Sequence, residues 1–223
     1  MKVIELKETI TASNDRDAEQ LRNKLRDSHT LMINLMASPG AGKTTLLDRT
    51  IRELDGRYRI GVMEADIDSD VDARKLAQLG VKAVQAHTDG MCHMDAGMTE
   101  TALNELGYDD LDLVFLENVG NLICPAEFDT GAGRNVMILS VPEGDDKPLK
   151  YPLMFTKADV LLISKIDTVS VFDFDFEKCR ERALKLNPNI RIFEISAKTG
   201  EGMGEWIDWL ASETDQWMKQ TYA

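Results

Sequence analysis

Short apolar runs alternate along the chain with stretches in which apolar residues recur every three or four positions among charged ones. An uninterrupted apolar run of strand length is typical of a strand buried on both faces, as in a parallel sheet covered by helices. The pattern therefore predicts an α/β fold in three layers, with a mostly parallel seven-stranded sheet flanked by helices. The expected strands occupy residues 31–37, 58–64, 81–86, 111–117, 136–141, 160–163 and 190–195.

Helical spacing of apolar residues predicts helices between the strands, over residues 43–54, 70–79, 96–106, 174–186 and 203–217. A further short helix is expected over residues 13–25, with Ser13 or Asn14 as its N-cap and with Leu21 and Leu25 on one face. No repeat, low-complexity tract or Pro/Gly/Ser-rich linker divides the sequence. We therefore expect an N-terminal arm over residues 1–30 and one domain over residues 31–223.

A phosphate-binding loop follows the first predicted strand. Residues 37–44 read Ala-Ser-Pro-Gly-Ala-Gly-Lys-Thr, which is the Walker A spacing with alanine at the first glycine position. Small residues let successive backbone N–H groups turn towards phosphate oxygens, and the following helix adds the positive end of its dipole. An ordinary strand-to-helix turn would not require Lys-Thr-Thr on the first helical turn. The nucleotide is therefore expected to contact Pro39, Gly40, Ala41, Gly42, Lys43, Thr44 and Thr45.

Two motifs after later strands indicate guanine as the base. Ser-Lys-Ile-Asp at 164–167 follows the sixth predicted strand, and Ser-Ala-Lys at 196–198 follows the seventh. A carboxylate at Asp167 can accept hydrogen bonds from guanine N1–H and its 2-amino group, a pair of donors that adenine lacks. GTPases of this type have asparagine where this chain has Ser164, whose shorter side chain predicts weaker guanine binding. The predicted base-side residues are Lys165, Asp167, Ser196, Ala197 and Lys198.

Acidic residues at the ends of two further strands are candidates for magnesium binding. Asp66 begins a cluster of aspartates after the second strand, where a hard cation would lie beside the γ-phosphate. Glu117 ends an apolar strand of Walker B type, and Gly120 follows closely enough to approach the terminal phosphate. The other aspartates are interpreted as helix caps, with Asp72 open to either role. We predict a Mg²⁺ site of Thr44, Asp66 and Glu117, and catalytic roles for Lys43, Asp66 and Glu117.

A third group of residues has the chemistry of a transition-metal site. Cys92 and His93 are adjacent in a glycine-containing turn, and only three residues separate Cys124 from Gly120. Thiolate and imidazole ligands suit Ni²⁺ or Zn²⁺. Three ligands leave a four-coordinate ion one short, which indicates an open site for transfer or completion by a second subunit, and we favour a homodimer. Because the phosphate-sensing glycine and a thiolate share one short segment, nucleotide hydrolysis is expected to alter the metal site.

The phosphate loop, the 117–125 segment Glu-Asn-Val-Gly-Asn-Leu-Ile-Cys-Pro, the Cys-His pair and the guanine motifs together resemble the HypB family of hydrogenase-maturation GTPases. The resemblance runs from about residue 31 to the C-terminus. It implies a P-loop NTPase of the signal-recognition/MinD/BioD (SIMIBI) class and a GTP-dependent homodimer. It further implies nickel insertion into [NiFe] hydrogenase, with a HypA-like metallochaperone and the hydrogenase large-subunit precursor as partners. Some members carry an N-terminal cysteine motif or His-rich stretch, whereas residues 1–30 hold only His29, so nickel storage is not expected.

Composition limits the remaining choices. The net charge is −13, with no basic block, so nucleic acid is not an expected partner. Three scattered cysteines, no export signal and no apolar run long enough to span a membrane favour a soluble, cytoplasmic protein. The alternatives are a urease-type nickel GTPase, a small-molecule kinase, and a metal-binding module with a vestigial nucleotide site. The urease-type GTPases have a Cys-Pro-His motif, whereas cysteine and histidine are contiguous in this chain. His87 and Cys179 are interpreted as structural.

Overall fold

The strands form a single sheet, in agreement with the prediction from the apolar runs. The computed structural model describes residues 6–54, 56–66, 79–88 and 90–219, without the side chains of residues 6–10 and of Asp66. The seven strands pair in the order β3-β2-β4-β1-β5-β6-β7, and all six pairings are parallel. Their bounds are β1 Leu31–Ala37, β2 Ile60–Asp66, β3 Lys82–His87, β4 Leu113–Glu117, β5 Arg134–Ser140, β6 Val160–Ser164 and β7 Arg191–Glu194.

The helices that connect these strands agree largely with the helical spacing. Four predicted helices are confirmed as α2 (Lys43–Glu53), α4 (Ala96–Leu106), α8 (Phe176–Leu186) and α9 (Met203–Lys219). The predicted helix over residues 70–79 lies outside the described residues except for Leu79, as do Asp68, Asp70 and Asp72. Shorter elements complete the connections: η1 Tyr108–Asp110, α5 Cys124–Glu127, η2 Val141–Glu143, α6 Lys147–Lys150, α7 Pro152–Lys157 and η3 Ile166–Thr168.

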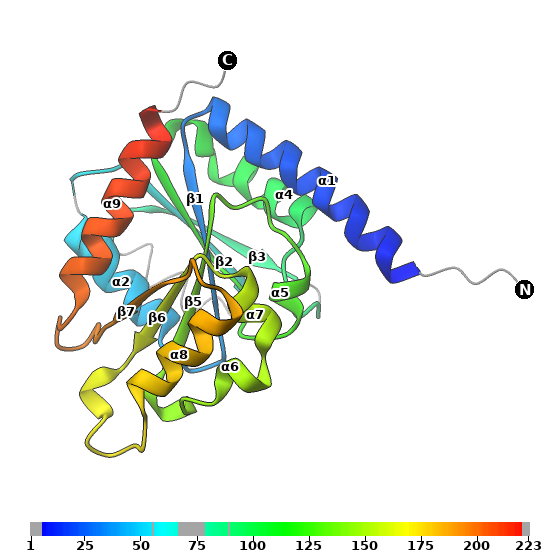
Figure 1. Cartoon of the computed structure of the whole chain (residues 1–223). Coiled ribbons are helices and arrows are strands. Elements are labelled where there is room, and N and C mark those ends of the chain that lie inside the picture. Colours follow the sequence, from blue (N-terminus) through cyan, green and yellow to red (C-terminus); the bar gives the residue numbers. More distant parts are fainter. Residues whose placement is uncertain (1–5, 55, 67–78, 89, 220–223) are drawn as a thin grey trace, which may run out of the picture.

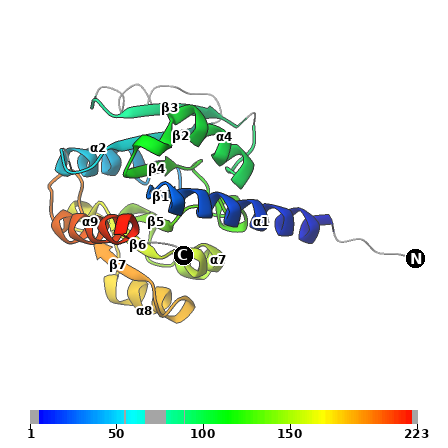
Figure 2. The ribbon, with the colours of Figure 1, turned by 90° about the horizontal axis from the view of Figure 1, so that it is seen from above.

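The sheet lies between two layers of helices. Helices α2 and α9 lie on one face, and α1, α4 and α7 lie on the other (Figure 2). Alternate residues of β5 enter different apolar clusters, Val136 and Ile138 in one and Met137 and Leu139 in the other. Both faces of the central strands are therefore buried, which explains why these strands are apolar at every position.

The N-terminal helix differs from the prediction. Helix α1 spans Leu6–Asp27, so it begins well before Ser13 and neither Ser13 nor Asn14 is its N-cap. Its first turns project beyond the other elements (Figure 1). Ala18, Leu21 and Leu25 are each at most 1% exposed, so the C-terminal half of α1 is part of the hydrophobic core. The buried stripe, and not a capping side chain, determines where this helix lies.

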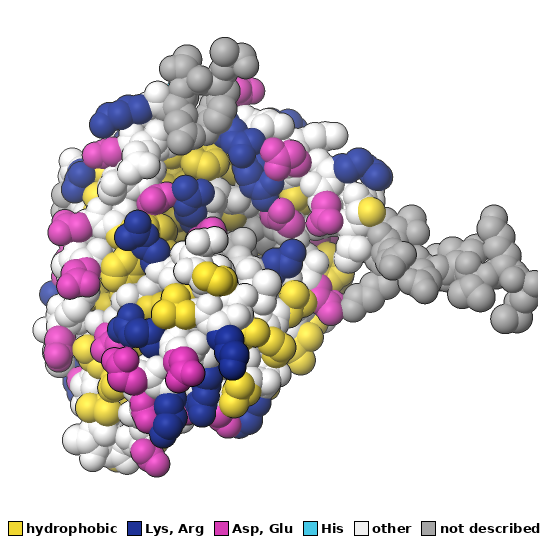
Figure 3. Space-filling model, in the orientation of Figure 1, with side chains coloured by type: hydrophobic (Ala, Val, Ile, Leu, Met, Phe, Trp, Pro, Cys, Tyr) yellow, Lys and Arg dark blue, Asp and Glu magenta, His cyan; other side chains and the backbone are white. Residues whose placement is uncertain are grey.

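The surface mixes charges of both signs. On the face seen in Figure 3, basic and acidic side chains of the described residues are interspersed over the helices, separated by small apolar areas. Across the part of the chain that the structure describes, no helix combines the length and apolar character needed to cross a membrane.

Candidate nucleotide and metal sites

The phosphate loop connects β1 to α2 at the carboxyl ends of the parallel strands. Gly40 has φ +75° and Gly42 φ +98°, backbone conformations in which a side chain would be strained. Gly42 is the N-cap residue of α2 and has no side chain to cap the helix, so the first N–H groups of the helix are directed into the loop. The loop borders a pocket of about 590 Å³ that is also lined by Glu117, Gly120 and Lys165.

Hard oxygen ligands meet at the edge of this pocket. Thr44 Oγ1 donates a hydrogen bond to Glu117 Oε1 at 2.9 Å, which joins the first turn of α2 to the end of β4. A hydroxyl and a carboxylate next to a phosphate-binding loop are the ligand types that Mg²⁺ uses in proteins, so the residues present fit this ion. The backbone of Asp66 ends β2, but its side chain lies outside the described residues.

The structure adds a carboxylate that the sequence did not single out. Glu64 of β2 is the register partner of Glu117 of β4, and both side chains are about 5% exposed or less. Glu64 also lines the pocket with Thr44. Two carboxylates that lie side by side repel each other when both are ionised, and a cation bound at this edge of the pocket would reduce that repulsion. The position of Glu64 near the end of a strand was a signal in the sequence that could have indicated a role in the pocket. The sequence could not show that Glu64 lies beside Glu117, because the register between β2 and β4 is a property of the folded sheet.

The guanine-side residues come together around the ends of β6 and β7. Ser196 Oγ donates to Asp167 Oδ1 at 2.7 Å, and Lys198 Nζ lies 4.0 Å from Asp167 Oδ2. Lys165 has φ +59° and its Nζ donates to the Gly40 carbonyl at 2.6 Å. The loops after β1, β6 and β7 are thus in contact, which places the proposed base and phosphate regions next to each other.

Ser164 retains one of the two contacts expected of asparagine at this position. Its Oγ donates a buried hydrogen bond to the carbonyl of Ala41 at 3.0 Å. The end of β6 therefore braces the phosphate loop, even though the hydroxyl is short. A weaker contact with the base stays a prediction.

Gly120 lies directly against the phosphate loop. A Cβ atom at this position would be 3.2 Å from both the backbone N and the Cα of Pro39. Only a residue without a side chain fits at this separation unless one of the two loops moves.

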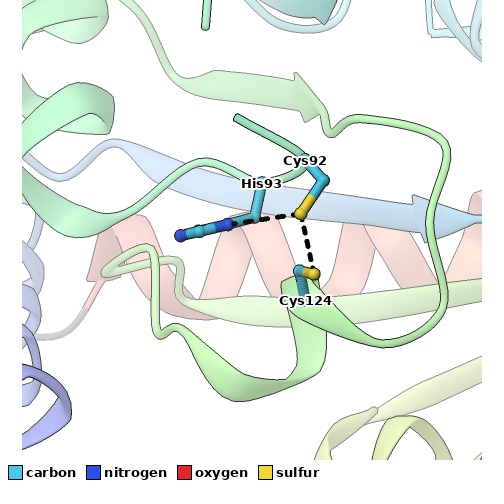
Figure 4. A group of neighbouring side chains, drawn as sticks. All are labelled: Cys92, His93 and Cys124. Carbon is cyan, nitrogen blue, oxygen red and sulfur yellow. Dashed lines mark hydrogen bonds between the residues drawn. The ribbon is translucent and has the colours of Figure 1, made fainter. Parts of the chain in front are cut away.

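The three predicted metal ligands are neighbours in space (Figure 4). Their ligand atoms all lie within 4.8 Å of one another, with Cys92 Sγ 2.7 Å from Cys124 Sγ and 3.9 Å from His93 Nδ1. Both thiols are free. Two sulfur ligands of a tetrahedral ion lie about 3.8 Å apart, so the thiolates would separate by about 1 Å on binding. Two soft thiolates and an imidazole fit Ni²⁺ or Zn²⁺.

The surroundings of these ligands are partly apolar. The His93 ring stacks on Phe128 with centroids 4.0 Å apart, and burial lowers the pKa of His93, which favours the neutral ring that binds metals. The hydrogen bond with Cys124, followed by burial, raises the pKa of Cys92. Two apolar side chains next to the thiols are exposed, Met91 by 42% and Ile123 by 57%.

The segment between Glu117 and Cys124 contacts both sites. At one end, Gly120 lies against Pro39 of the phosphate loop. Further along, Asn121 Nδ2 donates to the Cys92 carbonyl at 3.4 Å, and Asn118 Oδ1 accepts from Met94 N at 3.3 Å. A displacement of this segment would therefore be transmitted to the turn that carries Cys92 and His93.

Comparison with known proteins identifies the family to which this architecture belongs. Residues 31–194 match the model of the CobW/HypB/UreG nucleotide-binding domain. The hydrogenase maturation factor HypB of Azotobacter chroococcum is 47% identical over 94% of this chain and 68% of its own length. The chain belongs to the HypB family. The hydrogenase/urease maturation factor HypB of Helicobacter hepaticus is 41% identical over 96% of this chain and 90% of its own length. A crystal structure of HypB from Helicobacter pylori in complex with nickel superposes with a TM-score of 0.87, at 36% identity, over 95% of this chain and 99% of that one.

Membership of the HypB family accounts for the P-loop NTPase fold and for a nucleotide-binding domain. Within that fold, the structure brings together most of the residues predicted from the sequence. The phosphate loop, Thr44, Glu117 and Gly120 meet at the pocket, and Cys92, His93 and Cys124 form a separate group. Cys179 is fully buried in the second apolar cluster, as predicted for a structural residue, and burial raises its pKa to about 12.

Proposed function

We propose that this HypB-family chain is a GTP-hydrolysing metallochaperone switch that inserts nickel into [NiFe] hydrogenase. The observation that carries the proposal is the 117–124 segment, which contacts the phosphate loop through Gly120 and the Cys92 turn through Asn121. A segment that touches both sites can report the loss of the γ-phosphate to the metal ligands.

In the proposed reaction, each residue of the pocket has a defined electrostatic or geometric task. Lys43 and the N–H groups at the start of α2 stabilise negative charge on the β- and γ-phosphate oxygens. Mg²⁺ supplies charge neutralisation, with Thr44, Asp66 and Glu117 as its proposed residues. Glu117 accepts a hydrogen bond from Thr44, which holds both oxygens in place. Unassisted switch GTPases turn over at roughly 10⁻⁴ to 10⁻² s⁻¹, and we expect a rate in that range.

Guanine selection is assigned to Asp167, held by Ser196, with Lys165 and Lys198 over the base and the Ala197 N–H at O6. Asp167→Ala is expected to weaken GTP binding by roughly 5- to 150-fold, since a good polar base contact contributes about 1–3 kcal/mol. Competition with labelled GTP by unlabelled ATP is the measurement. If ATP displaced GTP from the unsubstituted chain at equal concentration, a kinase-type function would replace this proposal.

The metal site is proposed to take Ni²⁺ or Zn²⁺ as transported ions through Cys92, His93 and Cys124. Three ligands leave one position of a four-coordinate ion open. That position could be filled by a residue of the partner subunit in a homodimer, or by the protein that receives the ion. The proposed partners are a HypA-like metallochaperone and the hydrogenase large-subunit precursor. A cytoplasmic setting keeps the three free thiols reduced.

The function as a switch is tested by nickel affinity in different nucleotide states. We expect the affinity for Ni²⁺ at the Cys/His group to differ between the chain with GDP and the chain with a non-hydrolysable GTP analogue. Equal affinities together with an unchanged oligomeric state would exclude the switch. The H. hepaticus relative is named a hydrogenase/urease maturation factor, so the same experiment should be followed by transfer to apo-hydrogenase and apo-urease precursors.

A further inference from the structure

Helix α1 carries a buried amide that the proposed function does not use. Asn14 is 8% exposed and lies on the same face of α1 as Ala18, Leu21 and Leu25, which pack into the core. Asparagine is a poor residue in a helix interior, and burial of an amide is costly unless its polar atoms are paired. Both polar groups of the Asn14 amide are therefore expected to be paired.

The amide of Asn14 bonds two segments that are distant in the sequence. Its Oδ1 accepts a hydrogen bond from the backbone N–H of Ala96 at 2.9 Å, and its Nδ2 donates to the carbonyl of Asp129 at 2.9 Å. Ala96 is the first residue of α4 and follows His93 by three residues. Asp129 follows Cys124 by five residues. One side chain thus connects the segment that holds Cys92 and His93 to the segment that holds Cys124.

Further contacts fix the second segment to α1. Two turns along the helix, Arg22 donates to both carboxylate oxygens of Asp129 at 2.8 and 2.7 Å, and its Nε donates to the Ala132 carbonyl at 3.0 Å. A Cβ atom on Gly131 would lie 3.0 Å from the Ala18 carbonyl, so the helix and this segment are in close contact. The Phe128 ring, next to Asp129, stacks on His93. Helix α1 therefore holds the Phe128 side of the metal site against the His93 side.

We infer that Asn14 is a positioning residue for the metal site, which sets the separation of Cys92 and His93 from Cys124 through its two hydrogen bonds. The inference rests on the proposed metal site, because Asn14 touches no metal ligand itself. Groups that orient metal ligands commonly contribute tenfold or more to affinity.

The test replaces Asn14 in the full chain and titrates Ni²⁺. Asn14→Leu removes both hydrogen bonds and keeps the branching and the number of heavy atoms of the side chain, and we expect it to lower Ni²⁺ affinity about tenfold and to change the thiolate-to-nickel absorption bands. Asn14→Asp keeps the acceptor for Ala96 N–H but places a carboxylate oxygen against the Asp129 carbonyl, so the connection to the Cys124 segment is lost while the connection to α4 stays. A loss of Ni²⁺ affinity is again expected, and this variant keeps the test valid if Asn14→Leu fails to fold. GTP affinity should be unchanged in both.

The control is Leu25→Val, which loosens the packing of α1 three turns further along the helix than Asn14 and removes neither of the two hydrogen bonds. It should lower the melting temperature and leave Ni²⁺ affinity and the absorption bands unchanged well below that temperature. If Leu25→Val and Asn14→Leu reduced Ni²⁺ affinity equally, Asn14 would be a packing residue only, and the inference would be wrong.

A second measurement needs no metal. Diamide oxidises two neighbouring thiols to one disulfide and takes up their two hydrogens, so the rate of Cys92–Cys124 bond formation reports how often the two segments meet. The rate should fall several-fold in Asn14→Leu and stay unchanged in Leu25→Val. If the unsubstituted chain bound no Ni²⁺, the proposed function would be wrong. If the oxidation rates were equal in all variants, the inference about Asn14 would be wrong, whatever the result of the Ni²⁺ titration.

Discussion

A hydroxyl at position 164 is enough to brace the phosphate loop, because the Ala41 carbonyl passes within 3.0 Å of it. The sequence predicted a departure from the asparagine found in related GTPases and a weaker contact with the base. A residue type shows how far a side chain can reach. Whether a neighbouring loop comes within that reach depends on the fold, in which β5 lies between β1 and β6 in the sheet.

Gly120 gives the sharpest prediction at the residue scale. Gly120→Ala would place a methyl group 3.1 to 3.2 Å from three atoms of Pro39, two of them backbone atoms. The phosphate loop or the 117–124 segment must then shift, so we expect a loss of GTP affinity of at least tenfold, equivalent to about 1.4 kcal/mol. The measurement is titration with a fluorescent GTP analogue.

A matched control for this substitution is Gly204→Ala in α9, because a Cβ atom there would meet nothing within 4 Å. Gly204 is the second residue of α9 and has no positive φ, so alanine fits there without strain, and this variant should be at least as stable and bind GTP normally. Normal GTP affinity in Gly120→Ala would show that the two loops are not tightly apposed in solution.

The three cysteines are expected to differ in reactivity. Cys179 is fully buried and its pKa is raised to about 12, chiefly by burial, so at pH 8.5 it is neither ionised nor accessible. Cys92 and Cys124 are only half-buried. A thiol reagent should therefore label two cysteines in the folded chain and three in denaturant, and saturating Ni²⁺ should protect the first two. Labelling of all three at one rate in the folded chain would contradict the structure.

At the scale of elements, the sequence predicted the strands well because burial on both faces leaves a continuous apolar run. It failed at the start of α1, since Ser13 and Asn14 suit an N-cap, whereas tertiary packing places Asn14 inside the helix. The metal group was predicted from residue types. The stacking of His93 on Phe128 was not, because no short-range pattern relates a turn before α4 to the end of α5.

Helix α1 provides a prediction about the proposed division at residue 30. Leu21 and Leu25 are at most 1% exposed, and burial of each contributes about 1.5–3 kcal/mol. The chain comprising residues 31–223 should therefore lose at least about 3 kcal/mol of unfolding free energy relative to the full chain, measured by urea denaturation. Equal stability of the two chains would support an arm that is independent of the domain, and the Leu25→Ala variant should fall between them.

At the scale of the whole molecule, the two sites belong to different elements but share one edge of the sheet. The phosphate loop follows β1, the 117–124 segment follows β4, and the Cys92 turn leads into α4. Strands β1 and β4 are neighbours, so their carboxyl ends bring the phosphate loop and the Cys124 segment together. Parallel pairing thus explains why residues far apart in the sequence form a connected pair of sites.

The proposed homodimer is expected to form over the metal site, because Ile123 is 57% exposed and Met91 is 42% exposed beside ligands that are one short of four. Ile123→Ser should weaken the dimer formed with a GTP analogue and Ni²⁺, since about 25 cal/mol is lost for each Å² of apolar surface no longer buried. Sedimentation velocity is the measurement.

Leu149→Ser is the control, since Leu149 is 65% exposed on α6, where its neighbours are residues of α7 and α8. GTP affinity should be normal in both variants. An unchanged dimer in Ile123→Ser, or equal weakening in Leu149→Ser, would place the interface on another surface.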